Sequence, residues 1–283
     1  MHTLKSRILQ KTYVNKKRLR IVHYYILRFF EKVTERQRML KTRTFLNKAY
    51  YVYSHDSSAY ITIKTGILRE KERPLIRYFT NELKHDSVFL DVGSHYGFYA
   101  LLASEVIKDG HIFAFEPSLH LKKALEKNLQ QISNCTLVNM AVGSHTGNVC
   151  FYDSKTTGNS SLSSTKENTA LEKDLNQHKQ IIPVTCLDEF FKKDKIDYIK
   201  IDVEGAEIDV LLGARKTIEE HRPVIALEIW KEHDVKLLET IKEMNYEFYK
   251  ITTNGKLNKI NDQKIYTEIS GNYENFIIKH HAR

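Results

Sequence analysis

The sequence is poor in cysteine, and its few cysteines are badly placed for crosslinking or metal binding. Cys135, Cys150 and Cys186 are odd in number and have no short spacing. This argues against a disulfide framework and against a cysteine-ligated zinc site. The pattern predicts buried, unreactive thiols in a reducing compartment.

Long apolar runs are also missing. The most apolar early segment, IVHYYILRFF at 21–30, is too short to span a bilayer and is interrupted by His23 and Arg28. The N-terminus carries charges but no apolar core followed by a small-residue cleavage site, which a signal peptide would have. We therefore expect a cytoplasmic protein, with peripheral attachment to a membrane as the alternative.

Charge is abundant but unevenly distributed. Of the 283 residues, 41% are hydrophobic, which suffices for a packed core in one large domain or two small ones. Residues 1–48 hold fourteen lysines and arginines against two glutamates, a net charge of +12, whereas the whole chain carries +9. The basic character therefore belongs to an N-terminal extension.

This basic extension, residues 1–48, contains no glycine or proline and has a broken apolar stripe at roughly helical spacing, so we expect it to be helical. Either the helix packs on the domain with its charges in water, or it contacts an anionic surface such as phospholipid, polyanionic glycan or nucleic acid. No RNA-binding signature accompanies it, so nucleic acid is the least favoured of these partners.

The rest of the chain predicts an ordered series of elements. Residues 49–68 have two β-rich runs around Ser54–Ser58, which predicts a hairpin, and 72–84 predicts a helix. From residue 88 onward, strand-like and helix-like segments alternate. Strands are expected at 88–92, 111–116, 136–142, 198–203 and 224–230, and helices at 97–107, 118–131, 206–219 and 233–244.

The alternation predicts a doubly wound α/β fold around a parallel sheet. Two final strands at 246–252 and 275–280, with no helix between them, predict an antiparallel edge. The polar segment 153–179 predicts a long loop. We divide the chain into a basic helical extension with its hairpin, residues 1–80, and a ligand-binding domain, residues 81–283.

The stretch VFLDVGSHYGFYALLA, residues 88–103, predicts a strand, a glycine turn and a helix. Gly93 and Gly97 permit a backbone that a ligand can approach closely, and the helix N-terminus offers free N–H groups. The spacing matches neither a G-x-G-x-x-G dinucleotide loop nor a P-loop. The turn alone therefore does not identify a ligand, and a tight turn without any ligand remains an alternative.

Several predicted strands end in an acid. These are Asp91, Glu116, Asp202 with Glu204, and Glu228. In a doubly wound sheet, ligands bind at the carboxyl ends of the strands, so we expect these acids to converge on one site. Glu116 ends the strand after the glycine turn, where an acid accepts hydrogen bonds from ribose hydroxyls. This favours a nucleoside ligand.

The motifs DVGSHYG, AFEPS, NMAVGS, GNSSL, IKIDVEGAE and ALEIW, in this order, resemble those of the FkbM family of S-adenosylmethionine-dependent methyltransferases. The resemblance covers roughly residues 86–280. It implies a class I methyltransferase (Rossmann-like) fold, whose sheet ends in an antiparallel strand pair. It also implies S-adenosylmethionine as the cofactor of domain 81–283.

The resemblance implies roles for particular residues. The loop formed by Asp91, Gly93, Ser94, His95 and Gly97 would hold the amino-acid end of the cofactor. The family often has asparagine where this chain has His95. A histidine here still donates a hydrogen bond to a carboxylate, and it makes the site sensitive to pH near neutrality.

Further roles follow from the same resemblance. Glu116 would bind the ribose, Asn139 and Ala141 would lie beside the adenine, and Asp202 and Glu204 would face the sulfonium and the acceptor. A hydroxyl acceptor must lose its proton, which requires a base. Asp202 and Glu204 are two residues apart, so their side chains point to the same side of a strand and either can serve as this catalytic base.

Structural roles remain open for the same acids. Glu204 and Glu207 would also stabilise the N-terminus of the helix that follows Gly205. Asp202, Glu204 and Glu228 offer the oxygen ligands that a divalent cation prefers. Transfer from a sulfonium does not need a metal, however, and we predict that none is bound.

The sequence thus predicts a methyltransferase that acts on a hydroxyl of a glycan, glycolipid or secondary metabolite. In the loop GNSSLSS, Ser160 and Ser161 would suit such a polar acceptor. Three alternatives remain: an RNA methyltransferase that uses the basic extension, a nicotinamide-dependent oxidoreductase, and a binding module without catalysis. The missing G-x-G-x-x-G motif argues against the oxidoreductase.

Overall fold

The computed structural model describes residues 17–34, 37–67, 69–154, 161–162, 177–192, 195–230, 235–261, 264–269 and 272–282. Among them, the main sheet has eight strands in the order β13-β12-β14-β11-β10-β3-β4-β5. These are β3 (Val88–Val92), β4 (His111–Phe115), β5 (Cys135–Val138), β10 (Tyr198–Ile201), β11 (Val224–Trp230), β12 (Tyr246–Ile251), β13 (Leu257–Ile260) and β14 (Tyr273–His280).

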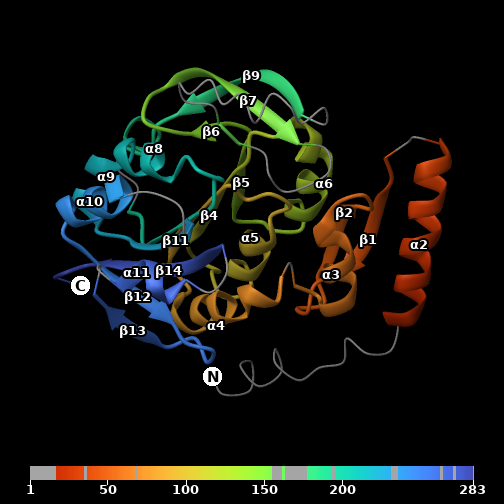
Figure 1. The fold of residues 1–283 in the computed structure, drawn as a ribbon, viewed down its shortest axis with the longest axis horizontal. Helices are drawn as coiled ribbons and strands as arrows, with labels where there is room; N and C mark the ends of the chain where they lie inside the picture. Colours follow the sequence, from red (N-terminus) through yellow and green to blue (C-terminus); the bar gives the residue numbers. More distant parts are fainter. Residues whose placement is uncertain are drawn as a thin grey trace.

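The strand directions confirm the predicted fold class. From β5 to β11 all neighbouring strands are parallel, whereas β14 lies antiparallel between β11 and β12. The sheet is therefore doubly wound and parallel, with an antiparallel C-terminal strand pair (Figure 1). Its central strands β3, β10 and β11 are buried on both faces, which agrees with their runs of β-branched and other apolar residues.

Helices cover both faces of the sheet. Side chains of α4 (Arg73–Glu82), α5 (Phe98–Ala103) and α6 (Leu119–Leu129) share one apolar cluster with Phe89 of β3. Leu90, the next residue of the same strand, belongs to a second cluster with α8 (Glu207–Leu212), α9 (Arg215–His221) and α10 (Val235–Glu243). The two clusters follow from the alternation of side chains along a strand.

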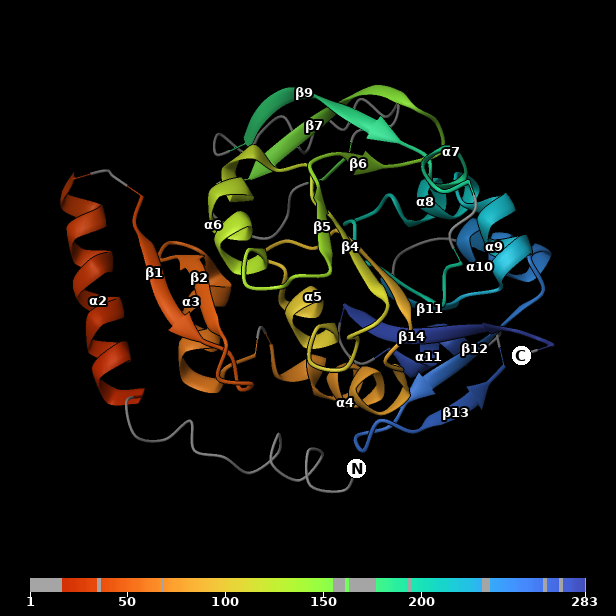
Figure 2. The same cartoon turned by 180° about the vertical axis from the view of Figure 1, so that it is seen from behind.

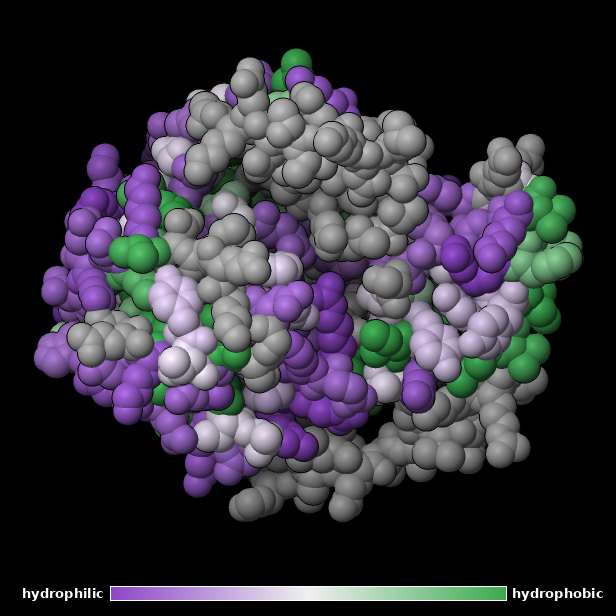
Figure 3. All heavy atoms as spheres, in the orientation of Figure 1, coloured by the Kyte–Doolittle hydropathy of each residue, from purple (hydrophilic) through white to green (hydrophobic). Residues whose placement is uncertain are grey.

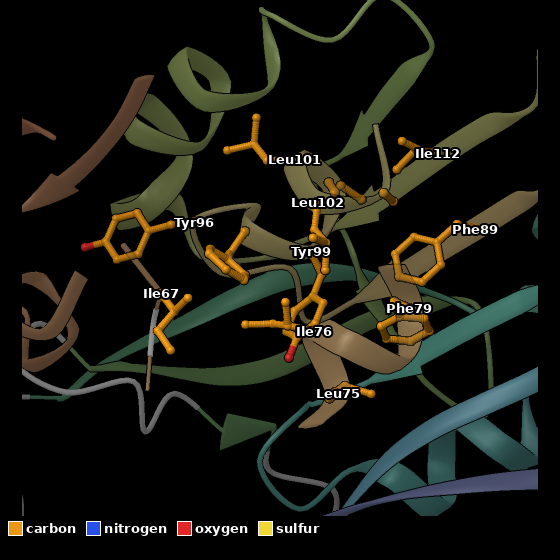
Figure 4. Packing of buried hydrophobic residues seen from close by; sticks show 14 of the residues in the cluster. Ile67, Leu75, Ile76, Phe79, Phe89, Tyr96, Tyr99, Leu101, Leu102 and Ile112 are labelled. Atoms are coloured by element: carbon orange, nitrogen blue, oxygen red, sulfur yellow. The ribbon is translucent and has the colours of Figure 1, made fainter. Parts of the chain in front are cut away.

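Aromatic rings dominate the first of these clusters. Phe79 of α4 packs edge-on against Phe89, with ring centroids 5.2 Å apart, and against Tyr99 of α5 at 5.9 Å. Figure 4 shows these rings with their aliphatic neighbours. The cluster also includes Leu40 and Tyr50, so the N-terminal part of the chain shares a core with the sheet. The division at residues 80 and 81 stays a prediction.

The N-terminal elements differ from those predicted. After α2 (Lys17–Thr34), β1 (Met39–Arg43) pairs with β2 (Ala49–Tyr53), and α3 (Ser57–Thr65) follows. The helix expected over residues 1–48 is therefore confirmed at 17–34 but not at 39–43, where β1 lies, and the hairpin expected at 49–68 was wrong. Asp56 explains the second error, because its side chain accepts a hydrogen bond from Ser58 N and caps a helix where the β-branched residues suggested a strand.

The polar segment was also predicted incompletely. A second sheet has the order β6-β9-β7-β8, with β6 (Ala141–Val142), β7 (Gly147–Ser154), β8 (Ser161–Leu162) and β9 (Gln177–Thr185). Strands β7, β8 and β9 thus enter the expected loop 153–179, of which 155–160 and 163–176 lie outside the described residues. The strand expected at 136–142 is divided between two sheets, because β5 ends at Val138 and β6 begins at Ala141.

Smaller corrections concern the C-terminal half. The helix expected at 206–219 is two helices, α8 and α9, which Gly213 separates. A Cβ atom on Gly213 would lie 2.0 Å from the carbonyl oxygen of Gly143, so two chain segments meet closely here. The short α7 (Leu187–Phe190) was not predicted, and α11 (Ile265–Glu268) lies where no helix was expected. A 3-10 turn, η2 (Glu70–Glu72), precedes α4.

The arrangement in space is the same in both ribbon views (Figures 1 and 2). The second sheet covers one end of the main sheet, and α2 lies at the outer edge beyond β1 and β2. Within the described part of the chain, no helix combines the length and the apolar character needed to cross a bilayer.

Candidate active site

A pocket opens at the carboxyl ends of β3, β4 and β10, where a doubly wound sheet places its ligands. The segment between β2 and α4 also contributes to its wall. The residues lining it are Asp56, Ser58, Arg69, Glu72, Val92, Gly93, Ser94, His95, Tyr99, Phe115, Glu116, Pro117, His120, Leu121, Met140, Ala141, Val142, Phe151, Lys200, Asp202, Val203 and Glu204.

The glycine turn lies against the end of β10. Gly93 has a φ of +77°, and a Cβ atom on it would lie 1.9 Å from the carbonyl oxygen of Asp202. Only glycine fits this close crossing. Gly97 has a φ of +74° but does not line the pocket. A Cβ atom on it would instead meet the side chains of Leu125 and Leu129 in α6. The first glycine shapes the site, and the second allows helix packing.

Glu116 is positioned by the backbone around it. Its carboxylate accepts hydrogen bonds from His95 N at 2.8 Å and from Ser118 N at 3.0 Å. The residue is 7% exposed and lines the pocket. Both carboxylate oxygens are thus held at the wall of the pocket by backbone N–H groups. The ribose-binding role of Glu116 stays a prediction.

Asp91 lies behind the pocket rather than on its wall. Its Oδ2 accepts a hydrogen bond from Ala100 N at 3.1 Å, at the start of α5. Burial raises the pKa of Asp91 to about 6, although the nearby Lys200 ammonium opposes this shift. The carboxylate therefore joins the glycine turn to the helix, which is a positioning role at one remove from any ligand.

His95 faces a carboxylate that the sequence analysis did not identify. Its Nε2 lies 3.6 Å from Oδ2 of Asp56, and both residues line the pocket. Burial lowers the pKa of His95, but the hydrogen bond and charge of Asp56 outweigh this effect, so the pKa is raised above its ordinary value. Ser58 donates to Asp56 through its backbone N and its Oγ, which fixes the carboxylate.

A buried lysine holds the charge of Asp202. Lys200 Nζ donates to Asp202 Oδ2 at 2.9 Å and lies 4.9 Å from the ring centre of Tyr99. Burial raises the pKa of Asp202, but the Lys200 ammonium more than compensates and the pKa is lowered. Tyr99 in turn donates to the carboxylate of Glu72, whose pKa burial raises. Asp202 is therefore the anionic member of this group.

Glu204 and Glu228 complete an acidic group with Asp202. Each of the three offers a carboxylate oxygen, and these oxygens lie within 4.8 Å of one another, close enough for one divalent ion. Burial raises the pKa of Glu204 to about 7, and the charge of Asp202 adds to the shift. Burial, again with the Asp202 charge, raises the pKa of Glu228 further. The pKa values of the three acids therefore differ widely.

The backbone assigns different roles to Glu204 and Glu207. Glu204 has a φ of +53°, in the left-handed region that non-glycine residues rarely adopt, and it lines the pocket. Glu207 Oε1 accepts a hydrogen bond from Gly205 N at 3.1 Å, at the start of α8. Glu207 therefore stabilises the helix start, as one interpretation proposed, whereas Glu204 is directed to the site.

The adenine side of the predicted site is apolar. Phe115, Met140, Ala141 and Val142 line it, whereas Asn139 lies between β5 and β6 outside the lining. Of the predicted site residues, Gly93, Ser94, His95, Glu116, Ala141, Asp202 and Glu204 share one pocket. Ser160 lies outside the described residues, and so does the side chain of Ser161.

Sequence reasoning missed several residues of the pocket wall. Three of them, Asp56, Arg69 and Glu72, come from segments before β3, and His120 comes from α6. The expectation that ligands bind at the carboxyl ends of strands does not extend to these segments. Lys200 carried a signal that was overlooked. A lysine in the otherwise apolar strand segment YIKI is 3% exposed, and a buried charge requires a partner.

Comparison with known proteins gives a consistent result. The family model described as "Methyltransferase FkbM domain" matches residues 91–248. A curated protein, Hexuronic acid methyltransferase AglP of Haloferax volcanii, is 26% identical over 149 residues, which are 52% of this chain and 58% of that protein. The chain therefore spans less than two thirds of this relative's length.

Solved structures resemble the chain more distantly. The crystal structure of methyltransferase FkbM from Methylobacillus flagellatus gives a TM-score of 0.46 at 17% identity, covering 79% of this chain and 54% of that one. An rRNA methylase from Streptococcus thermophilus gives 0.43 at 11% identity, covering 76% and 98%. The strand order, and not these scores, establishes the fold.

Proposed function

The chain belongs to the FkbM methyltransferase family, and from this premise we propose that it transfers a methyl group from S-adenosylmethionine to a hydroxyl of a glycan, glycolipid or secondary metabolite. The observation that carries the proposal is one pocket that holds both the anchored Glu116 and the acids Asp202 and Glu204. A relative named for hexuronic acid supports a sugar as the acceptor.

The pocket residues fit the proposed cofactor. Glu116, fixed by two backbone N–H groups, would accept the two ribose hydroxyls. Met140 and Val142 offer an apolar surface for the adenine, and His95, whose pKa Asp56 raises against the effect of burial, suits the cofactor's carboxylate. Asp202, which Lys200 keeps ionised, would lie near the positive sulfonium. The donor set thus matches each part of the molecule by charge and polarity.

The chemistry assigns a task to Glu204. The bound cofactor supplies a methyl group on a good leaving group, so the protein mainly has to align the acceptor and exclude water. An acceptor hydroxyl must also lose its proton, and a base with a pKa near neutrality does this best. Glu204, with its pKa raised to about 7 by burial, meets this condition better than Asp202, whose pKa the Lys200 ammonium lowers against the effect of burial.

Calorimetry tests the cofactor part of the proposal. S-adenosylmethionine and its demethylated product are titrated into wild type, Glu116→Gln and Glu219→Gln. Glu219 is an exposed helix residue with the same side chain, and it serves as the control. We expect micromolar binding in wild type and in the control, and binding about tenfold or more weaker in Glu116→Gln. Binding of NAD instead would overturn the proposal.

A second assay addresses the acceptor. Labelled S-adenosylmethionine is incubated with oligosaccharides that contain uronic acids, with neutral oligosaccharides and with RNA. We expect label to enter a sugar fraction and to disappear in Glu204→Gln. Incorporation into RNA alone, with a steep salt dependence, would instead favour the RNA alternative.

A further inference from the structure

Helix α2 (Lys17–Thr34) has apolar side chains on two opposite faces. On the inner face, Ile21, Tyr24 and Leu27 pack against the domain core. Glu31, also on this face, accepts hydrogen bonds from Ser54 Oγ at 2.8 Å and Arg38 N at 3.1 Å. These contacts fix the helix on the domain, so the opposite face points away from it.

The outer face carries a continuous row of large apolar residues. They recur at helical spacing, and all are about half exposed or more: Val22 (55%), Tyr25 (58%), Ile26 (48%), Phe29 (64%), Phe30 (47%) and Val33 (65%). The remaining exposed large hydrophobics of the described chain are single residues on other elements. Figure 3 shows the row as green atoms along the edge of the molecule formed by α2. Such a concentrated patch marks an interaction surface.

Positive charge borders this outer face. Arg28 and Lys32 lie on α2, and the sequence adds Lys17, Arg18 and Arg20 within the same helix, against the single acid Glu31. Glu31 is 8% exposed and pairs with Arg28, with 3.1 Å between Arg28 Nη1 and Glu31 Oε2, so it offsets one of these charges and leaves α2 cationic overall. Pairing this face with a second copy would bring two cationic helices together. An anionic partner avoids that repulsion.

We propose that the outer face of α2 binds an anionic membrane surface, with the helix lying in the plane of the interface. Its aromatic and branched side chains would enter the boundary between headgroups and acyl chains, as amphipathic interfacial helices do. Lys32 is long enough to reach the phosphates while its stem covers apolar surface. This surface goes beyond the methyl-transfer reaction and does not depend on it.

The inner face connects the helix to the pocket. Glu31 Oε1 lies 3.3 Å from His55 Nδ1, and His55 Nε2 lies 3.3 Å from His120 Nε2, which belongs to a lining residue. Substitutions that test the proposal must therefore leave Glu31 untouched. Phe29 and Val33 meet this requirement, because they lie on the outer face.

Vesicle flotation tests the proposal with the full chain. Wild type is mixed with phosphatidylcholine vesicles, with and without phosphatidylglycerol. The variant Phe29→Ser/Val33→Ser removes two outer apolar groups, and Ile181→Ser/Val235→Ser removes two exposed apolar groups elsewhere. We expect wild type and the control to float with the anionic vesicles only, and the α2 variant to bind about tenfold or more weaker. Equal melting temperatures establish that the variant is folded.

Four results would overturn the proposal. In the first, wild type does not bind the vesicles at low ionic strength. In the second, the α2 variant binds as well as wild type, which means that charge alone attaches the protein. In the third, sedimentation shows a wild-type dimer that the α2 variant makes monomeric, so the face belongs to a second copy. RNA binding that the same variant abolishes, without vesicle binding, likewise assigns the face to another partner.

Discussion

The ammonium group of Lys200 lies 2.9 Å from the carboxylate of Asp202, and the two residues differ sharply in exposure. The Lys200 side chain is 4% exposed, whereas that of Asp202 is 34% exposed and borders the pocket. A buried cation thus supports an anion at the surface of the site. Removing either partner would leave an uncompensated charge, so each partner keeps the other ionised.

This pair separates the roles of the neighbouring acids. Lys200 lowers the pKa of Asp202, whereas burial and the charge of Asp202 raise that of Glu204. Adjacent acids with separated pKa values typically divide electrostatic and proton-transfer tasks between them. In the proposed reaction, the ionised Asp202 would provide the electrostatic contribution, and Glu204 would exchange the proton.

Glu204 is expected to titrate near pH 7, the value to which burial raises its pKa. Below this pH it is protonated and cannot act as a base, so the methylation rate rises with pH and levels off above about pH 8. Carbon NMR of protein labelled at glutamate carboxyls measures the titration without an acceptor. Glu204→Gln identifies the resonance, because it alone disappears. A midpoint near 4.5 would contradict the assignment.

Asp202→Asn is expected to move the Glu204 titration to lower pH. Since the charge of Asp202 raises the pKa of Glu204, its removal lowers the midpoint by about one unit. The same substitution leaves the Lys200 ammonium buried without its partner, so the melting temperature falls as well. An unchanged midpoint in a folded variant would show that burial alone sets the pKa.

Glu228→Gln is expected to stabilise the protein at alkaline pH. Burial raises the pKa of Glu228 in the folded state, so the native protein keeps a proton that the unfolded chain releases above about pH 4.5. Stability contributed by this group therefore falls as pH rises. Glutamine removes that dependence. Melting temperatures should differ by less than about 1 °C at pH 4.5 and by about 3 °C or more at pH 8. A variant that is less stable at pH 8 would contradict the assigned shift.

Gly93→Ala is expected to destabilise the fold by about 3 kcal/mol, because its Cβ would clash with the Asp202 carbonyl in addition to straining the backbone. Gly205→Ala is the matched control. Gly205 also has a positive φ, of +102°, but nothing lies within 4 Å of its added Cβ. It should cost only about 1 kcal/mol of backbone strain. Urea unfolding measures both, and equal losses would show that the close crossing is unimportant.

The sequence predicted the central strands of the sheet well because β3, β10 and β11 are apolar and almost wholly buried. Two local signals were strong. The run at 88–92 is mainly apolar and buried, and Glu116 is followed directly by a proline. In the observed strand order, β10, β3 and β4 are neighbours, so the residues that follow their carboxyl ends lie together. Seven predicted site residues consequently line one pocket.

The failures have equally physical causes. Residues 57–65 contain β-branched side chains that favour a strand, but the Asp56 cap and the burial of Ala59 and Ile63 make them a helix. Asp56 itself joins the site only because α3 folds back against the glycine turn, a long-range contact that periodicity does not encode. The outer face of α2 was visible as an apolar stripe, but which side of it packs depends on tertiary contacts.

Divalent metal is expected to leave the protein unchanged, although Asp202, Glu204 and Glu228 are close enough to ligate an ion. Lys200 already neutralises Asp202, and burial keeps Glu228 protonated at neutral pH, so the cluster offers a cation little net charge. A bound ion would raise the melting temperature through mass action. We therefore expect equal melting temperatures with EDTA and with millimolar Mg²⁺ at pH 7. A rise with Mg²⁺ that Glu228→Gln abolishes would instead identify a metal centre, because that substitution removes one ligand while preserving the shape of the site.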